Sequence, residues 1–535
     1  MASFRSAFTT YNRYVDPNAT GDLLALLTQA PLVRVDRATD RLEPWLAESW
    51  TESPDGLTYT LKLRQGVTFS DGTPFTSADV LFSFQVISDP RTQPPALSDA
   101  ILVGGKPVVV EAPDPGTVVL RFPEKFAPGL RLVDSVPILP KHKLETAFAA
   151  GNFSEAWGAA TPPADLAGLG PFVVSEHVAG ERLVLARNPH YWRKDAAGVQ
   201  LPYLDKLTVL IIPDQNTEAL RMEAGEVDLM SNADIRPEDY SAFKRVSDEG
   251  RLRLIEGGIG LDPNLLWFNL APAHAADPRS PWLRSAALRQ AISCAIDRDA
   301  IVNAVFLGAA VPVYGPITPA NKAWYTPPAA PCVHDVARAK ALLASVGLTD
   351  RDGDGMLEDA TGRPAQFSLL SQKGHTIRER TSSMIQQQLR AVGITVDLVM
   401  LDAGGIPRRW MQQDYDAIYF GVQSSATDPG LNMQFWLSSG YLHFWNPGQG
   451  KPATDWERQI DDLFRRQTAT ADMAERRRLF AEAEGIFSEQ LPGIYLVAPR
   501  TIIAVSARVA NPTPAPQIPQ LLWSADTLAS TSARR

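Results

Sequence analysis

Leu42-Glu-Pro-Trp-Leu-Ala-Glu-Ser-Trp50, continued by Leu57-Thr-Tyr-Thr-Leu-Lys-Leu-Arg-Gln-Gly-Val-Thr-Phe-Ser-Asp-Gly-Thr-Pro-Phe-Thr-Ser-Ala-Asp79, is the most informative stretch of this chain. Residues 58–63 alternate polar and apolar side chains, which is the two-residue period of a half-buried strand. Farther on, Thr76 precedes an apolar run, and the acidic residue three positions later completes a capping-box pattern. The stretch therefore predicts a strand followed by a capped helix.

Three downstream segments extend this pattern along the chain. They are Arg187-Asn-Pro-His-Tyr-Trp192, Gly225-Glu-Val-Asp-Leu229 and Leu288-Arg-Gln-Ala-Ile-Ser-Cys-Ala-Ile-Asp-Arg-Asp-Ala-Ile-Val302. Together with the first stretch, they resemble segments of the family 5 extracellular solute-binding proteins and occur in the family's order. That family comprises the oligopeptide-, dipeptide- and nickel-binding receptors of ABC importers. The resemblance covers nearly the whole chain.

The resemblance implies an α/β fold of the periplasmic-binding-protein-like class II (cluster C), with two α/β lobes, a hinge and an extra inserted domain. Lobe I would be discontinuous and comprise residues 1–41, 166–262 and 499–535. The extra domain would span residues 42–165, and lobe II residues 263–498. In such a fold, hinge closure buries a ligand between the lobes.

The residues of the second half independently indicate alternating strands and helices. Residues 367–370 and 394–400 have strand character, and between them residues 376–392 place apolar side chains on one helical face before Gly393, a helix stop. This order predicts a parallel βαβ unit. Further helices are predicted over about 283–305, 454–467 and 471–489, with a strand at 494–497 and proline-rich irregular segments at 312–319 and 325–331.

Length and composition place the chain among large globular proteins. Its 535 residues predict roughly three or four domains. Apolar residues make up 45%, charged residues 21%, and the net charge is −9. Because lysine and arginine are scattered, no basic run indicates a nucleic-acid partner. No stretch approaches the ~18 consecutive apolar residues of a membrane-spanning helix.

The start of the chain bears on localisation. The opening Met1-Ala-Ser lacks the charged start and apolar run of a signal peptide. The resemblance begins almost at once, at Phe8-Thr-Thr-Tyr-Asn-Arg-Tyr-Val-Asp-Pro17. We therefore expect a mature domain whose export signal has been removed, located in the periplasm or outside the cell, either free or lipid-anchored.

Cys294 and Cys332 are the two cysteines of the chain, so no disulfide framework holds the fold together. Each is most simply a small buried residue. The alternative is a single bridge between them, because both fall in the predicted lobe II and an exported protein meets an oxidising compartment. Sequence leaves both interpretations open.

Motifs for catalysis are missing from the sequence. No two of the seven histidines are four residues apart, and no Gly-x-Ser-x-Gly elbow, phosphate-binding loop or dinucleotide fingerprint occurs. We therefore predict a protein that is not an enzyme and that requires no cofactor. A hydrolase assembled from distant residues is the competing class.

One acidic segment resembles half of a calcium loop. Asp350, Asp352 and Asp354 alternate and are followed by Gly355, as in the first half of an EF-hand. The twelfth position is Thr361, where a bidentate glutamate would be needed. A structural Ca²⁺ is one prediction for this segment, and a solvated surface turn is the other.

Aromatic side chains are candidates for ligand contact. Trp436 follows the segment 423–429, and Trp267 lies near the predicted lobe crossing at residue 262. Stacked aromatic rings with a few polar groups suit an organic ligand. The alternative for any single tryptophan is a place in the core.

The resemblance also implies polar ligand contacts. Segment 416–429, which includes Gln423, matches the strand and loop whose aspartate binds the ligand's α-amino group in peptide receptors. That position is Ser425 here, and a hydroxyl cannot replace the charge. Either Asp428 takes over, or the ligand is not recognised by a free amino terminus.

Further ligand contacts are expected at two other places. The family's ligand loop on the opposing lobe falls at Asn18-Ala-Thr20. Arg408, Arg409 and Trp410 follow the predicted βαβ unit, where family members often place ligand-facing side chains. One of the arginines could hold a carboxylate bidentately, and the alternative is that both are solvated surface charges.

Together these features predict an extracytoplasmic solute-binding protein of an ABC transporter. It would capture a peptide or peptide-like organic ligand as a monomer and deliver it to permease subunits. The alternatives are a receptor of the same fold for a non-peptide solute or for sensing, and, from a different class, a hydrolase.

Overall fold

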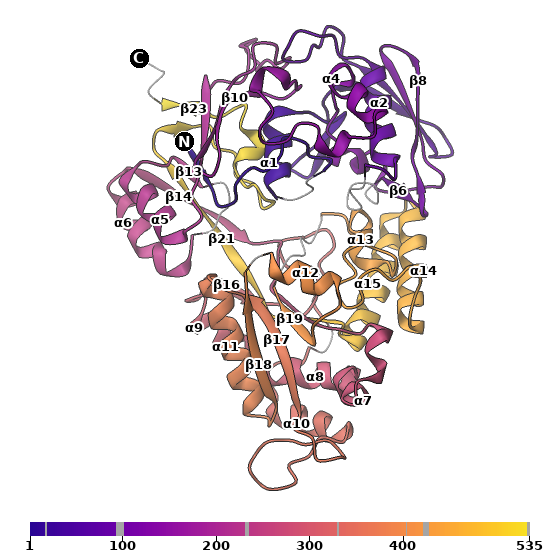
Figure 1. Ribbon diagram of the computed structural model, residues 1–535, viewed down its shortest axis with the longest axis vertical. Coiled ribbons are helices and arrows are strands. Elements are labelled where there is room, and N and C mark those ends of the chain that lie inside the picture. The colour runs from indigo at the N-terminus through magenta and orange to yellow at the C-terminus, as the bar shows by residue number, and fades with distance from the viewer. Residues whose placement is uncertain are drawn as a thin grey trace. The chain divides into compact units, whose positions relative to one another are not determined.

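The computed structural model describes residues 1–15, 19–92, 101–230, 235–328, 331–402, 404–420 and 427–531, and it divides into two compact units (Figure 1). Unit 1 comprises Met1–Gly258 and Thr501–Arg535, and unit 2 comprises Ile259–Arg500. The chain therefore leaves unit 1 once and returns to it once. The proposed division of the first unit into lobe I and an inserted domain stays a prediction.

A large mixed sheet runs through unit 1. Its strands are, in order, β10 (Phe172–Val178), β11 (Arg182–Arg187), β12 (Lys206–Ile211), β1 (Ala2–Phe4), β13 (Leu229–Met230), β21 (Val497–Ser506) and β14 (Leu252–Ile259). The first residues of β21 belong to unit 2, where they pair with β16 (Ala310–Pro312). β1 is parallel to both of its neighbours, whereas β10, β11 and β12 pair antiparallel. α5 (Gln215–Ala224) and α6 (Tyr240–Asp248) bury Met222 and Phe243 in a small core that also contains Ile212, the residue after β12.

The stretch quoted first forms the strand and the capped helix that its pattern predicts. β5 (Thr58–Leu63) buries alternate residues, and Thr76 caps α2 (Ser77–Ser88) in a complete capping box with Asp79. The backbone N–H of Thr76 donates to Asp79 Oδ2 at 2.9 Å. β5 lies in an antiparallel sheet with the order β4 (Ala47–Glu52), β5, β9 (Thr117–Arg121) and β8 (Val109–Asp114).

Shorter elements complete unit 1. They are α1 (Ala19–Thr28), α4 (Lys141–Ala149), and the strand pairs β2 (Val33–Asp36) with β3 (Arg41–Pro44), β6 (Leu102–Val103) with β7 (Lys106–Pro107), and β22 (Val509–Ala510) with β23 (Ala529–Ser530). α4 packs against α2, and their contact includes an edge-to-face pair of Phe82 and Phe148.

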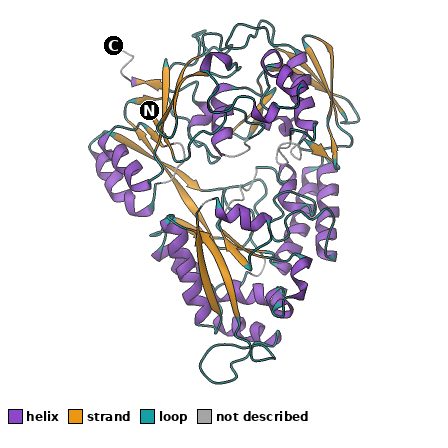
Figure 2. Ribbon diagram, in the orientation of Figure 1, coloured by secondary structure: helices purple, strands orange, loops and turns teal. Residues whose placement is uncertain are grey.

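Unit 2 is built on a five-stranded mixed sheet that contains the predicted βαβ unit. The strand order is β18 (Thr395–Leu401), β17 (Gln366–Gln372), β19 (Ala417–Tyr419), β15 (Leu265–Phe268) and β20 (Gly493–Tyr495). β17 and β18 are parallel and are joined by α11 (Thr376–Arg390), which lies beside them in Figure 2. The predicted βαβ unit is confirmed.

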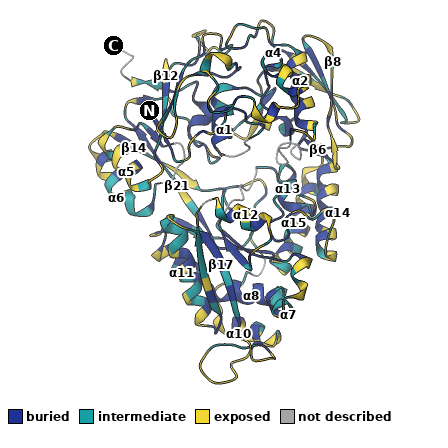
Figure 3. Cartoon of the chain, viewed as in Figure 1, coloured by how far each residue is buried: buried dark blue, intermediate teal, exposed yellow. Residues whose placement is uncertain are grey.

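Alternation along β15 assigns the two faces of this sheet to two cores. Leu266 and Phe268 belong to one core, whereas Leu265 and Trp267 belong to the other. The sheet is accordingly buried on both sides, and Figure 3 shows β17 in the colour of buried residues. The helices around it are α7 (Ser280–Leu283), α8 (Ala286–Ala295), α9 (Arg298–Ala304), α10 (Val336–Ser345), α12 (Gly405–Met411), α13 (Met433–Trp436), α14 (Asp455–Ala469) and α15 (Met473–Gln490).

The prediction of one helix over residues 283–305 is wrong. The chain leaves the helix at Ile296, and Asp297 starts α9 because its side chain accepts a hydrogen bond from the backbone N–H of Ala300 at 2.8 Å. Aspartate is a strong helix N-cap, so it competes with helix continuation. Apolar periodicity alone hid this break.

Cys294 and Cys332 form a disulfide, with their Cα atoms 4.9 Å apart. The bridge fastens the proline-rich segment to α8, so the simpler interpretation of two unlinked buried cysteines is wrong. None of the helices within the described ranges is long and apolar enough to span a bilayer.

Candidate functional site

Unit 2 gathers three predicted ligand residues, Trp267, Trp410 and Trp436, in one aromatic cluster. We define this aromatic cluster as Trp267, Trp410, Tyr415, Phe435, Trp436, Phe444 and Trp445. Phe444 lies at its centre, because the ring of Trp267 stacks on it at 4.8 Å and Trp410 Nε1 donates to its carbonyl oxygen at 2.9 Å. Tyr415 donates to the same oxygen at 2.8 Å.

The three tryptophans lie in the interior of unit 2. Trp267 is 2% exposed, Trp410 6% and Trp436 1%, and Trp436 stacks on Phe464 at 4.8 Å. Such burial matches the alternative that sequence holds for any single tryptophan, a place in the core. Their contact with a ligand stays a prediction.

A buried pair of Glu457 and His443 contacts the aromatic cluster through Trp445. Glu457 Oε1 lies 3.0 Å from His443 Nε2 and accepts hydrogen bonds from Trp445 Nε1 at 3.2 Å and Gln449 Nε2 at 3.1 Å. Burial would raise the pKa of Glu457, but His443, Gln449 and Trp445 outweigh it and lower this pKa to about 2. The carboxylate is therefore held ionised inside the protein.

Sequence reasoning did not identify this pair as a structural centre. A signal was available, because Thr454 and Glu457 have the spacing of a capping box, and Glu457 Oε2 accepts from the backbone N–H of Thr454 at 2.9 Å. The partner His443 lies in a loop, and its approach to Glu457 depends on tertiary packing.

Asp428 is already engaged within unit 2. Arg476 donates from Nη2 to Oδ1 at 2.7 Å and from Nη1 to Oδ2 at 2.9 Å, and the backbone N–H of Gly430 donates to Oδ1 at 2.8 Å. The side chain of Arg476 is 3% exposed. Its carboxylate partner is thus neutralised by a buried, bidentate guanidinium.

Arg409 lies in the last turn of α12 and pairs with Asp414 just beyond that helix. Its Nε donates to both the carbonyl oxygen and Oδ2 of Asp414, each at 2.9 Å, and the side chain is 31% exposed. The guanidinium is partly solvated, and its role toward a ligand carboxylate stays a prediction.

The remaining candidates divide between described and undescribed parts of the chain. Thr20 is buried at the start of α1. Asn18, Gln423 and Ser425 lie outside the described residues.

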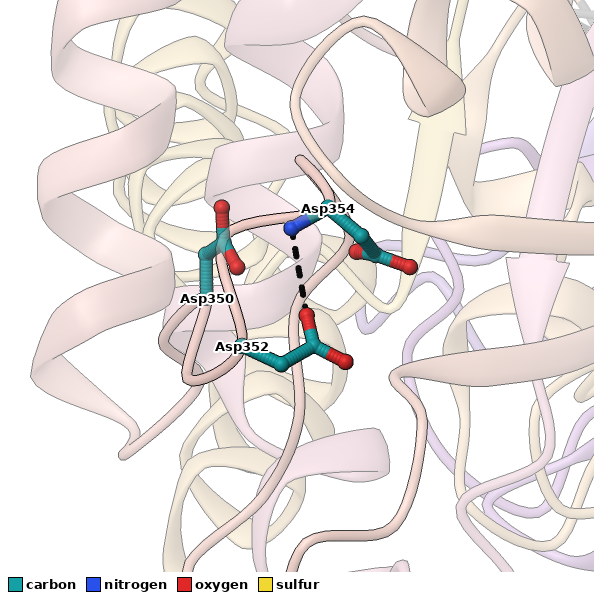
Figure 4. A group of neighbouring side chains, drawn as sticks. All are labelled: Asp350, Asp352 and Asp354. Carbon is teal, nitrogen blue, oxygen red and sulfur yellow. Dashed lines mark hydrogen bonds between the residues drawn. The ribbon is translucent and has the colours of Figure 1, made fainter.

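Asp350, Asp352 and Asp354 come together on an exposed loop, as Figure 4 shows. Their carboxylates offer oxygen atoms that lie within 4.8 Å of one another, and the loop is closed by its own hydrogen bonds, such as that from the Asp354 N–H to Asp352 Oδ1 at 3.1 Å. Oxygen donors of this kind suit Ca²⁺. The side chain of Glu358 is bound within the loop, since its carboxylate accepts a hydrogen bond from the backbone N–H of Arg351 at 2.9 Å.

Comparison with known proteins gives one consistent family. Residues 41–443 match the model of the bacterial extracellular solute-binding proteins, family 5 Middle. A probable ABC transporter-binding protein of Deinococcus radiodurans is 27% identical over 97% of this chain and 90% of that protein. The glutathione-binding protein GsiB of Escherichia coli K12 is 25% identical over 95% of this chain and 90% of its own length.

A third relative is known in both sequence and structure. The oligopeptide-binding protein AppA of Bacillus subtilis is 27% identical over 70% of this chain and 64% of that protein. Its structure in complex with a nonapeptide matches this fold with a TM-score of 0.80, at 23% identity, over 99% of this chain and 98% of AppA.

Proposed function

Because the chain belongs to the family 5 bacterial extracellular solute-binding proteins, we propose that it captures a peptide or peptide-like organic solute for an ABC importer. The receptor acts outside the cytoplasm, in the periplasm or extracellularly and free or lipid-anchored, and hands the solute to permease subunits. Binding energy shifts the receptor toward the conformation that the permease recognises. The observation that carries this proposal is the family match over residues 41–443.

The peptide class is supported by the relatives' own ligands. AppA is described with a nonapeptide and GsiB as glutathione-binding, and both align over most of this chain. A receptor for a non-peptide solute is the alternative.

We further infer that Asp428 does not anchor a free amino terminus. Both of its oxygens are bound by Arg476, so an incoming ammonium would have to displace a buried guanidinium. Since Ser425 carries no charge, neither residue supplies the unpaired carboxylate that such recognition needs. An N-acetylated peptide should accordingly bind within about threefold of its free counterpart, whereas an anchored ammonium would make the difference tenfold or more.

Native mass spectrometry of protein purified without unfolding tests the solute class. We expect a co-purifying organic species that is lost when the same protein is unfolded in guanidinium and refolded. Refolded protein should then gain thermal stability with a peptide from a mixed library, because a ligand at 100 times its Kd adds about 2.7 kcal/mol. No captured species and no shift across peptides would contradict the proposal.

We also propose that the solute leaves unchanged and that capture needs no cofactor. The relatives are binding proteins, and the sequence carries no motif for hydrolysis. Prolonged incubation of the refolded receptor with its peptide, followed by mass spectrometry, should return the intact mass. Cleavage that scales with receptor concentration would instead favour a hydrolase.

A further inference from the structure

Unit 2 contains a cavity of about 580 Å³ that is separate from the aromatic cluster. It is lined by α8, by the proline-rich segments after β16, by α10 and by α15. Of the sequence-predicted ligand residues that the structure describes, none lines it. The volume lies in the range of small-molecule sites in proteins.

The walls of this cavity are stiff and mainly apolar. Pro312, Pro316 and Pro327 contribute rings whose backbone φ is fixed, and Tyr314 adds an aromatic face. The disulfide of Cys294, which itself lines the cavity, ties the proline-rich wall to α8. A site with such walls is preformed, so little ordering is needed when a ligand enters.

Glu484 brings a carboxylate to this apolar space. It lies on α15, is half-buried, and receives no hydrogen bond or ion pair from the described residues. A partly desolvated carboxylate without a protein partner is unfavourable, because most polar groups withdrawn from water in proteins are paired. Burial raises the pKa of Glu484 to about 8. The group is therefore short of a partner that would stabilise its charge.

The other charged groups of the cavity favour a positive partner. Glu489 adds a second acid from α15, and Arg338 of α10 is an exposed base. Arg298, whose guanidinium lies 4.4 Å from the Tyr314 ring, is committed to the protein, since its Nε donates to the carbonyl of Tyr495 at 2.9 Å. Once Glu484 is ionised, the two acids of the lining outnumber its one base, which favours a bound cation.

We propose that this cavity is a second binding site, for a small organic cation that carries a primary ammonium on an apolar body, with Glu484 as the counter-ion. The ammonium offers three donors to a carboxylate that has none, in partly desolvated surroundings where such a bond is strong. The apolar body packs against the prolines and Tyr314. This site does not depend on the proposed function, because it uses none of the residues assigned there.

Binding of such a cation releases a proton. Below about pH 8 Glu484 holds a proton in the empty cavity, and an ammonium binds the ionised form. The other titratable groups facing it are Glu489, Arg338, Tyr314 and Tyr495, and burial raises the pKa of both tyrosines, which stay neutral there. Affinity should therefore rise about tenfold per pH unit up to about pH 8.

Titration calorimetry with phenethylamine, cyclohexylmethylamine and hexylamine tests the site, with 2-phenylethanol and phenylacetate as neutral and anionic matches. We expect at least one amine to bind, with about tenfold tighter binding at pH 7 than at pH 6. Proton release, measured in buffers of different ionisation enthalpy, should accompany binding. The neutral and anionic matches should bind at least tenfold more weakly than the amine.

Two variants locate the effect. Glu484→Gln should weaken amine binding at least tenfold at pH 8 and abolish its pH dependence, whereas Glu482→Gln, a control on the same helix that pairs with Arg478 outside the cavity lining, should change binding less than threefold. Circular dichroism and a retained unfolding midpoint establish that both variants fold. The proposal is overturned if no amine binds the wild type, if Glu484→Gln binds amines equally, or if 2-phenylethanol binds as tightly. A peptide that still binds in Glu484→Gln separates this result from the proposed function.

Discussion

Among single residues, Glu457 connects the loop that precedes α14 to the first turn of that helix. Its Oε1 accepts from His443, Trp445 and Gln449, and its Oε2 accepts from the backbone N–H groups of Ala453 and Thr454. The carboxylate therefore fixes the loop that carries Phe444 and Trp445 of the aromatic cluster to the start of α14.

The pKa of Glu457 makes a prediction about stability against pH. This pKa is lowered from 4.5 to about 2, so the ionised form stabilises the folded state above about pH 4.5, and this contribution is lost as pH falls toward 2. The shift corresponds to roughly 3 kcal/mol. Glu457→Gln should lower the free energy of unfolding by about that amount at pH 7, as measured with urea, and by much less at pH 2.5.

An exposed glutamate provides the control for this substitution. Glu475 on α15 pairs with Arg478 at the surface, so Glu475→Gln should leave the unfolding midpoint unchanged at both pH values. A Glu457→Gln penalty that is equally large at pH 2.5 would show that lost packing, not ionisation, causes it.

The pair of Asp428 and Arg476 makes a second prediction at this scale. Asp428→Asn leaves a buried guanidinium without its counter-ion and should lower the free energy of unfolding by about 3–5 kcal/mol. The double variant Asp428→Leu/Arg476→Met removes both charges and should recover most of this loss. Denaturant unfolding of the single and double variants measures the coupling. A stable Asp428→Asn protein that no longer binds peptide would instead give the carboxylate a ligand role.

At the scale of elements, the disulfide joins α8 to a proline-rich segment that has little regular structure. The bridged cysteines are 38 residues apart in sequence, so the cross-link restricts a sizeable loop of the unfolded chain. Replacing both cysteines by alanine should lower the free energy of unfolding by about 4 kcal/mol. Reduction of the wild type should reproduce the loss, and reduction should have no effect on the variant. Equal stability with and without the bridge would contradict this entropic account.

The acidic loop of residues 350–359 makes a prediction about metal addition. Three carboxylates meet there, but Thr361 stands where a calcium loop needs a glutamate, and the loop closes through its own hydrogen bonds. We therefore expect 1 mM CaCl2 to leave the unfolding midpoint unchanged relative to 1 mM EGTA. A site with a Kd of about 10 µM would add about 2.7 kcal/mol under those conditions. Such a gain, absent in Asp352→Asn, would establish a structural Ca²⁺.

Local patterns predicted several elements correctly because their causes are local. Alternation in residues 58–63 and the capping box at Thr76 depend on neighbours within a few positions, and both appear in the structure as β5 and α2. The βαβ unit ending in β18 is confirmed for the same reason. The break before α9 was missed because apolar periodicity continues through Asp297, while its capping bond decides the backbone path.

For the whole molecule, each unit has its own hydrophobic interior, and the sheet of unit 2 separates two cores. The cavity lined by Glu484 and the buried pair at Glu457 both lie within unit 2, but different helices form them, since Glu484 is on α15 and Glu457 is on α14. Sequence placed neither, because their members come from segments far apart along the chain.

The sequence by itself determined the family, the α/β class and the elements whose periodicity and caps act over a few residues. Tertiary structure alone decided that Cys294 meets Cys332, that Arg476 neutralises Asp428, and that the predicted tryptophans lie in a core. The physical reason is separation: a bridge, an ion pair and burial depend on distances between atoms that the chain brings together only when it folds, and no local pattern encodes those distances.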